Sequence, residues 1–350
     1  MTGSMVTPNL SNYLLLGVYT LIMVSLLTPI MRKISKLFGV FDVPSANHKT
    51  HQEPIPYLGG LAIVLGVCTV AYTSLFVLDS SKELLKLASS ILIPAVLMAG
   101  VGLLDDLKNL SPLPRFLTQS LFGISISFLL VLTETLGTPF GTNWLDIPIT
   151  TFFIVGITNA INFYDNVDGG ASGAIAISSV FLFILSWQSG QFLIAALSIV
   201  LAGATLGFLI WNKPPARIYM GDAGSMFLGI LIASLSIRFD PNTIGRIESL
   251  AIPLLLLAMP ILDTSVAVVS RIKRKISPFQ GGRDHLSHRL MRIGLSKRQS
   301  VLALWSGSIF FASFTIVVSN LNSSIGKISV IFAGTIWLML FIAFIGTEDE

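Results

Sequence analysis

The chain of 350 residues is too apolar to be a water-soluble globular protein. Hydrophobic residues make up 53% of it, charged residues 11%, and the mean hydropathy is +0.80. Soluble domains carry about 25% charged residues. The net charge of +4 is explained better by membrane topology than by nucleic-acid binding. A single cysteine, Cys68, excludes an internal disulfide.

Eleven hydrophobic segments are long enough to cross a membrane, which takes about 17 to 25 residues each. We therefore predict an all-α, polytopic transmembrane bundle that forms one domain over residues 1–350. The first segment follows a stretch without basic residues, so we expect an anchor rather than a cleaved signal peptide. The eighth segment is the shortest, which leaves ten spans as the alternative. The segments are 12–31, 58–78, 84–104, 116–136, 147–163, 170–187, 191–211, 225–240, 249–271, 299–319 and 326–346.

The distribution of lysine and arginine predicts the orientation of the bundle. With the N-terminus outside and eleven spans, 17 of the 22 basic residues fall on the cytoplasmic side, together with the C-terminus. A secondary transporter would carry charges near mid-membrane on interrupted helices. Here the acids gather at span ends on one side, which favours a cytoplasm-facing reaction site; a transporter of a phosphorylated metabolite or a non-catalytic scaffold is the alternative. The loops on this side are 32–57, 105–115, 164–169, 212–224 and 272–298.

A polar run ends the fifth span, where Asn159, Asn162, Asp165 and Asp168 follow one another at three-residue steps. On a helix each such step turns about 60° from a common face, so we expect the four side chains to converge. Amide and carboxylate oxygens suit Mg²⁺ or Mn²⁺, which shares substrate phosphates. A polar helix cap broken by Gly169–Gly170 is the alternative.

Two further acidic elements lie at span ends on the same side. Asp105 and Asp106 are neighbours at a helix end and point about 100° apart, so each can serve a different role. A solvated interfacial turn is the alternative. Asp222 lies between two glycines just before a span, where backbone amides can approach a phosphate. Because an acid repels a bare phosphate, we interpret Asp222 as a ligand of a bridging metal; an ordinary helix N-cap is the alternative.

The segment 271–298 combines nine Lys and Arg residues with His285 and His288, groups that can bind a diphosphate. H-x-x-H spacing occurs here and in the first loop, which raises zinc as an alternative. The chain lacks the cysteines or HExxH pattern that would support zinc. Asp263 lies inside the ninth span, two turns before Arg271. It is either a functional intramembrane acid or a residue that reaches toward the basic loop.

Taken together, these motifs resemble the polyprenyl-phosphate N-acetylhexosamine-1-phosphate transferases, the glycosyltransferase 4 group of membrane enzymes. The resemblance covers nearly the whole chain. The matching elements are the aspartate pair Asp105–Asp106, the N-x-x-N-x-x-D-x-x-D run Asn159–Asp168, the M-G-D-x-G-S motif Met220–Ser225, the H-x-H-H element His285–His288 and the first-loop signature His48–Gly60.

Three positions depart from the family pattern. Ser287 stands where many members have histidine, and Asn166 and Gly170 replace the Gly and Leu of the commoner run. The phospho-MurNAc-pentapeptide transferases share the fold, but their consecutive histidine triplet is absent here. That peptidoglycan substrate therefore ranks second.

The resemblance implies transfer of a HexNAc-1-phosphate, GlcNAc-1-phosphate first among them, from a UDP-sugar to undecaprenyl phosphate, which releases UMP and requires Mg²⁺, with Mn²⁺ as a substitute. It further implies an enzyme of the bacterial cytoplasmic membrane that initiates a cell-surface polysaccharide such as O-antigen or teichoic acid, and a homodimer. The roles implied are catalysis by Asp105, Asp106, His285 and His288, metal binding by Asp222 and Asp168, and substrate binding by Asn159, Asn162, Asp165, Arg283, Arg289, Lys49, His51 and Asp263.

The aspartate pair leaves two reaction routes open. Asp105 and Asp106 would orient or deprotonate the lipid phosphate, or one of them would form a covalent phospho-aspartyl intermediate. A phosphate monoester, with a second pKa of about 6, is largely dianionic at neutral pH and hardly needs a base. Direct attack by the lipid phosphate is therefore favoured.

Overall fold

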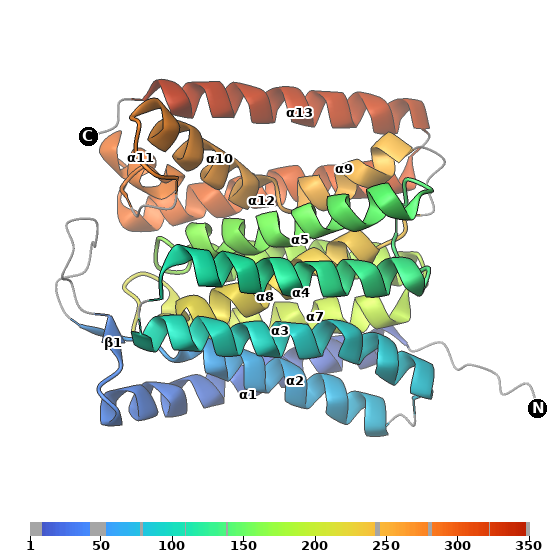
Figure 1. Cartoon of the computed structure of the whole chain (residues 1–350), viewed down its shortest axis with the longest axis horizontal. Coiled ribbons are helices and arrows are strands. Elements are labelled where there is room, and N and C mark those ends of the chain that lie inside the picture. Colours follow the sequence, from blue (N-terminus) through green and yellow to red (C-terminus); the bar gives the residue numbers. More distant parts are fainter. Residues whose placement is uncertain are drawn as a thin grey trace, which may run out of the picture.

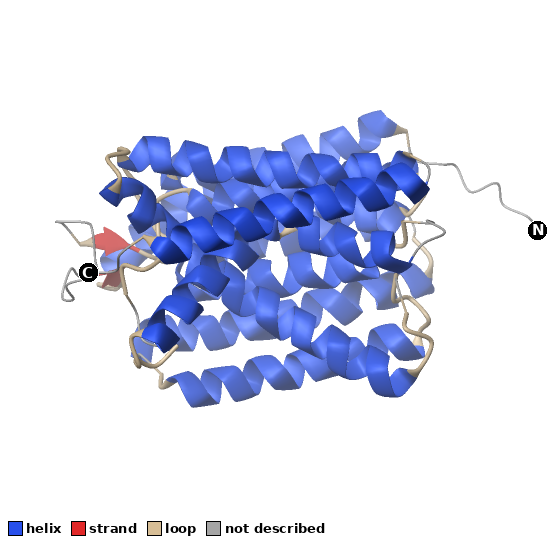
Figure 2. Cartoon of the chain, turned by 90° about the horizontal axis from the view of Figure 1, so that it is seen from above, coloured by secondary structure: helices blue, strands red, loops and turns tan. Residues whose placement is uncertain are grey.

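A computed structural model describes residues 9–42, 54–77, 80–108, 110–137, 139–241, 246–278, 282–321 and 323–347. Two views at right angles show long helices that run along one common direction (Figures 1 and 2). Two short strands, β1 (Phe41–Asp42) and β2 (Ile55–Pro56), form an antiparallel pair. The helices are α1 (Leu10–Leu37), α2 (Gly59–Val77), α3 (Lys82–Lys108), α4 (Pro112–Leu132), α5 (Asn143–Tyr164), α6 (Gly170–Gln188), α7 (Phe192–Asn212), α8 (Gly221–Arg238), α9 (Arg246–Leu256), α10 (Ala258–Lys273), α11 (Leu286–Arg292), α12 (Lys297–Asn320) and α13 (Ser323–Gly346).

The number of membrane spans agrees with the prediction. In the described part of the chain, ten helices are long and apolar enough to cross a membrane, and the bent pair α9–α10 brings the number to eleven. The all-α, multi-pass fold is thus confirmed. Helix α1 begins at the end of the bundle opposite to the one where α13 ends, as an odd number of spans requires (Figure 1). Which end faces the cytoplasm stays a prediction.

The span predicted over 249–271 is bent in the structure, because α9 and α10 meet at an angle of 75°. Pro260 has no N–H to donate to the carbonyl of Leu256, so the helical ladder breaks there. The freed carbonyl accepts a hydrogen bond from Ser178 Oγ at 2.6 Å, and the carbonyl of Ala258 accepts one from Trp337 Nε1 at 3.0 Å. These donors satisfy the carbonyls at the bend, as an apolar environment demands.

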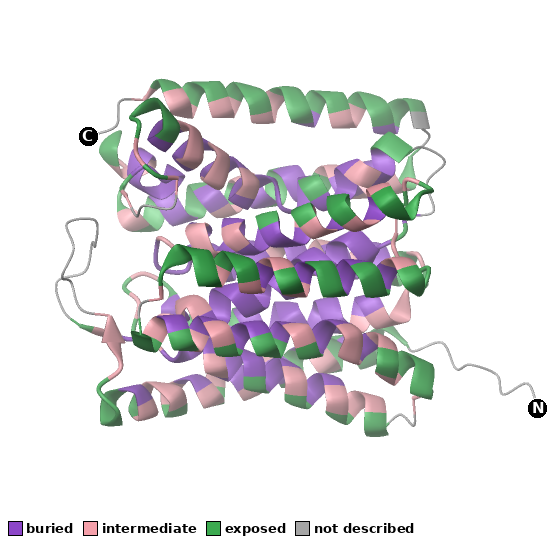
Figure 3. Ribbon diagram, viewed as in Figure 1, coloured by how far each residue is buried: buried purple, intermediate pink, exposed green. Residues whose placement is uncertain are grey.

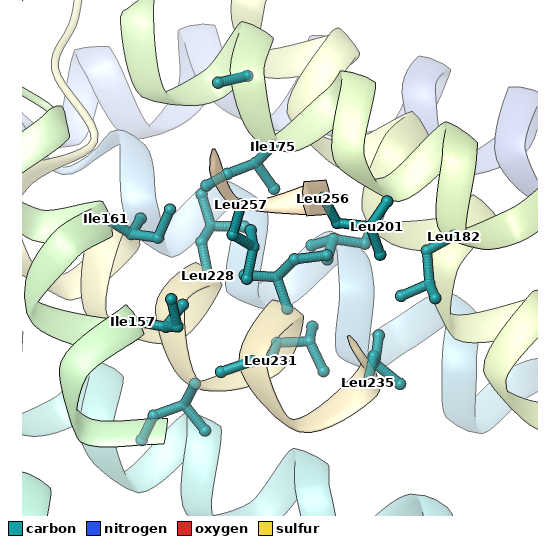
Figure 4. Close-up of a cluster of buried hydrophobic side chains, with 14 of the residues drawn as sticks. Ile157, Ile161, Ile175, Leu182, Leu201, Leu228, Leu231, Leu235, Leu256 and Leu257 are labelled. Carbon is teal, nitrogen blue, oxygen red and sulfur yellow. The ribbon is translucent and has the colours of Figure 1, made fainter. Parts of the chain in front are cut away.

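Helix α8 forms the centre of the bundle, and every residue from Ala223 to Arg238 is buried (Figure 3). It packs chiefly against α3 and α5. Its leucines meet apolar side chains from α5, α6, α7 and the α9–α10 bend (Figure 4). At the periphery, α13 exposes most of its side chains, as expected for a helix that faces lipid. The most buried span is thus the one that carries Asp222 in its first turn.

Two glycines bring the first turn of α8 close to its neighbours. A Cβ on Gly102 of α3 would lie 2.4 Å from the carbonyl oxygen of Asp222. A Cβ on Gly60 of α2 would lie 2.3 Å from the backbone nitrogen of Gly224. Only glycine permits this backbone approach. Gly102 lies one helical turn before Asp105 and Asp106. This close packing therefore brings Asp222 next to the aspartate pair at the end of α3.

Candidate functional site

One arginine joins two of the predicted aspartates at the end of the bundle that carries β1 and α11 (Figure 1). Arg115, in the first turn of α4, places Nη1 at 2.6 Å from Asp105 Oδ2 and at 2.9 Å from Asp222 Oδ2. The other oxygen of Asp105 accepts a hydrogen bond from the backbone N–H of Leu110 at 2.7 Å. Sequence reasoning counted Arg115 only as a topology signal, since nothing in its spacing marks a bridging role.

The side chain of Asp106, at the end of α3, caps the N-terminus of α8. Its carboxylate accepts hydrogen bonds from the backbone N–H groups of Asp222 at 2.8 Å and Ala223 at 3.1 Å. The hydroxyl of Tyr57 donates to the carbonyl oxygen of Asp106. A carboxylate is favourable at a helix N-terminus for the same reason as a phosphate. The sequence suggested that the backbone amides at the start of α8 bind a phosphate. In the structure they bind the carboxylate of Asp106 instead.

Asn162 and Asp165 complete the cluster from α5. Asn162 Nδ2 donates to Asp222 Oδ1 at 2.8 Å and to Ser225 Oγ at 2.9 Å. Asp165 follows the last residue of α5, and no group among the described residues donates a hydrogen bond to its carboxylate. Burial raises the pKa of Asp165 well above its usual value, and so do the negative charges of Asp222, Asp168 and Asp106. A bound cation would relieve this repulsion between Asp165 and the neighbouring carboxylates.

The predicted convergence holds only for part of the Asn/Asp run. Asn159 lies inside α5 but has its partner in α4, whereas Asp168 lies beyond Tyr164, where α5 ends. Asn159 donates instead to Gln119 Oε1 at 2.6 Å. Asp168 lies beyond the helix, where its carboxylate pairs with Lys297 at 2.8 Å and accepts from the N–H of Ala216 at 2.9 Å. These contacts favour a structural role for Asp168, and metal binding by it stays a prediction.

Asp263 anchors His285 inside the bundle. Its Oδ2 lies 2.7 Å from His285 Nδ1, and its Oδ1 accepts from the N–H of Leu286 at 2.7 Å. Arg271 Nη2 lies 3.1 Å from His285 Nε2, and a guanidinium can only donate. Nε2 therefore accepts, so Nδ1 carries the proton and donates to Asp263. These contacts agree with the interpretation that Asp263 reaches toward the basic loop, and substrate binding by Asp263 stays a prediction.

A buried ion pair fixes the same loop, and sequence reasoning missed it. Asp284 accepts two hydrogen bonds from Arg271, both at 2.8 Å, and one from Arg274 at 2.7 Å. Burial acts to raise the pKa of Asp284, but the hydrogen bonds and charge of Arg271 outweigh it and the pKa is lowered. The ion pairs of Asp284 thus help to fix the position of the neighbouring His285.

Arg289 is committed to structural contacts. Its side chain is buried, and its Nη1 donates to the carbonyl oxygens of Phe344 at 2.7 Å and Thr347 at 2.8 Å. Its Nε donates to the carbonyl oxygen of Asp284 at 2.8 Å. These contacts tie α11 to the end of α13. Substrate binding by Arg289 stays a prediction that none of these contacts supports.

The remaining predicted substrate-binding residues are less informative. Arg283 is exposed at the start of the same loop, where its guanidinium can meet a soluble ligand. Lys49 and His51 lie outside the described residues.

Two of the departures from the family pattern contact each other. Ser287 Oγ donates a hydrogen bond to Asn166 Oδ1. Asn166 Nδ2 in turn donates to the carbonyl oxygen of Phe163 at 2.8 Å and lies 3.3 Å from Asp263 Oδ2. The serine and the asparagine therefore form one link between the loop after α5 and α11.

His288 should give the protein a measurable pH dependence. Burial lowers the pKa of His288 to about 4, as do the positive charges of Arg283 and Arg292, against the opposing charge of Asp263. Because the folded protein excludes a proton that the unfolded chain accepts, stability is complete above about pH 6.5 and falls progressively toward about pH 4.

We expect His288→Gln to remove part of this dependence, measured as apparent melting temperature in detergent between pH 7.5 and 4.5. Asp284 does not interfere, because its lowered pKa affects stability only below its ordinary value of 3.8. Identical slopes for the variant and the parent would contradict the assignment.

The acidic cluster fits a metal that is shared with a substrate. In the described ranges, no three His, Cys, Asp or Glu side chains gather closely enough to form a complete metal site. Mg²⁺ is commonly held by one or two carboxylates plus substrate phosphates. Asp222 and Asp165 supply such oxygen donors. His285 has both ring nitrogens engaged, which disfavours a zinc site with His288.

The structure defines a multi-pass membrane protein with an acidic site at one end of its helical bundle. Residues 88–240 match Glycosyl transferase family 4. The chain is 35% identical over 333 residues to a probable undecaprenyl-phosphate N-acetylglucosaminyl 1-phosphate transferase of Bacillus subtilis, across 94% of this chain and 87% of that relative.

Two further relatives come from other bacterial groups. A decaprenyl-phosphate N-acetylglucosaminephosphotransferase of Mycobacterium tuberculosis is 31% identical, across 87% of this chain and 83% of its own length. An undecaprenyl-phosphate alpha-N-acetylglucosaminyl 1-phosphate transferase of Escherichia coli is 27% identical, across 82% and 78%. The chain belongs to the polyprenyl-phosphate N-acetylhexosamine-1-phosphate transferases of glycosyl transferase family 4.

Proposed function

We propose that the protein transfers GlcNAc-1-phosphate from UDP-GlcNAc to undecaprenyl phosphate, which yields undecaprenyl-diphosphate-GlcNAc and UMP and begins a cell-surface glycan. The observation that supports this most is the meeting of Asp105 and Asp222 on Arg115, with Asn162 bonded to Asp222. The names of the relatives support the sugar and the lipid acceptor.

The site suits phosphoryl transfer, which depends on positioning and neutralisation of charge. Mg²⁺, held by Asp222 and Asp165, would neutralise the diphosphate of the donor. Asp105 and Asp106 orient the acceptor phosphate at the membrane interface. His288 and Arg283, in the loop fixed by Asp284, would donate hydrogen bonds to the negative charge on the leaving nucleotide.

The membrane context supports a site on the cytoplasmic face of the bacterial cytoplasmic membrane. Most Lys and Arg residues belong to the helix ends and loops at the end of the bundle that carries β1 and α11. At such an interface the lipid tail stays in hydrocarbon while its phosphate meets a water-soluble nucleotide. A homodimer is part of this proposal and would be tested by the mass of the protein in nanodiscs.

UMP release tests the proposal directly. Purified protein with UDP-GlcNAc, undecaprenyl phosphate and Mg²⁺ should release UMP only when the lipid is present. A panel of UDP-sugars, with UDP-MurNAc-pentapeptide included, separates the family's substrates. Flux of an intact phosphorylated metabolite into sealed vesicles without UMP release would instead establish a transporter.

The direct route predicts that no sugar phosphate becomes bound to the protein. With radiolabelled UDP-GlcNAc and Mg²⁺ but without lipid acceptor, we expect no label on protein recovered under denaturing conditions. A stable label lost in Asp105→Asn or Asp106→Asn would establish a phospho-aspartyl intermediate. The engagement of Asp106 with the amides of Asp222 and Ala223 favours direct attack, because it holds that carboxylate in place.

A further inference from the structure

Arg115 lies where two carboxylates would otherwise repel each other. Its Nη1 alone contacts both Asp105 and Asp222, at 2.6 and 2.9 Å. Acidic groups beside hydrocarbon need a counter-charge. A single positive nitrogen between two carboxylate oxygens is also the arrangement that a small cation adopts between such ligands.

The exposure of the three side chains differs. Asp105 is 7% exposed and is fixed by the N–H of Leu110, whereas Arg115 is 19% and Asp222 27% exposed. Within the described part of the chain, only Nη1 of the guanidinium has hydrogen-bond partners, although the group carries five N–H donors. The edge of Arg115 that lacks partners is therefore available to an incoming phosphate.

We propose that Arg115 is an internal counter-ion of Asp105 and Asp222 that competes with a divalent cation for the carboxylate of Asp222. It thereby weakens binding of a bare metal ion until a diphosphate arrives. The inference rests on the proposed use of Mg²⁺. A diphosphate offers the guanidinium new acceptors, so release of the carboxylates and arrival of the metal with its nucleotide become coupled. The arrangement would make metal binding depend on substrate.

Binding of Mn²⁺ alone, measured by electron paramagnetic resonance on the full-length protein in nanodiscs without nucleotide, tests this. Arg115→Met removes the charge at similar length, and Arg115→Gln removes it while keeping hydrogen-bond donors. We expect both to bind Mn²⁺ about tenfold more tightly or better, since a like charge next to the ion is lost. Arg115→Lys keeps the charge and should bind as the parent does.

Arg298→Met is the matched control, because Arg298 is an exposed arginine in the first turn of α12 at the same end of the bundle. It should leave Mn²⁺ affinity unchanged. Unchanged or weaker Mn²⁺ binding in folded Arg115→Met or Arg115→Gln protein would overturn the inference. Failure of the parent to release UMP would instead refute the proposed function, because the Mn²⁺ measurement uses no substrate.

Discussion

Replacement of Asp222 by asparagine should lower the rate of UMP release by at least about 10³-fold, because the variant loses a charge where the donor diphosphate is neutralised. Asparagine preserves the shape and can still accept the hydrogen bond of Asn162. The fold should therefore survive, with an unchanged elution profile and a similar melting temperature. The rate is measured at saturating Mg²⁺ and both substrates.

Asp240→Asn provides the control for this variant. Asp240 lies two residues beyond the other end of α8, so the same chemical change is made on the opposite side of the membrane. It should leave the rate near that of the parent. A near-normal rate for Asp222→Asn at saturating Mg²⁺ would exclude a role for this carboxylate in metal binding.

Removal of Asp284 should produce the largest loss of stability. Asp284→Ala leaves the guanidinium of Arg271 buried without its carboxylate, at 2% exposure. Breaking a buried ion pair from one side costs about 3–5 kcal/mol. The expected result is a marked drop in the apparent melting temperature in detergent, with loss of activity as the loop of His285 loosens.

The exposed pair Lys86–Glu83 offers a comparison within the same protein. These side chains are 73% and 78% exposed and lie 3.4 Å apart in the first turn of α3. Glu83→Ala removes a carboxylate as well, but solvent-exposed pairs contribute little to stability. A melting temperature for Asp284→Ala equal to that of Glu83→Ala would show that the buried pair is not structurally important.

The spans and most of the site's carboxylates could be predicted from the sequence, because each depends on local patterns. Hydrophobic length defines a span, and an acid at a span end is costly without a partner. The α9–α10 bend was missed, although Pro260 is visible in the sequence. Proline is tolerated in membrane helices, and it breaks this one only where Ser178 and Trp337 satisfy the carbonyls at the bend.

The partners of the predicted residues could not be foreseen, since they come from other helices. Arg115 and Lys297 were counted as topology signals, yet one joins Asp105 to Asp222 and the other holds Asp168. The end of α5 at Tyr164 likewise decides that Asp168 leaves the helix face shared by Asn162. Such choices depend on tertiary packing, which local periodicity does not contain.

The hydrogen bonds of Arg289 have a consequence for biogenesis. Its acceptors, the carbonyl oxygens of Phe344 and Thr347, lie in the last turn of α13 and directly after it, more than 50 residues after Arg289 in the sequence. The loop that holds His285 therefore reaches its final geometry only after α13 has inserted. A nascent chain arrested before that point would carry Asp105, Asp106, Asp165 and Asp222 yet hold this histidine loop unanchored.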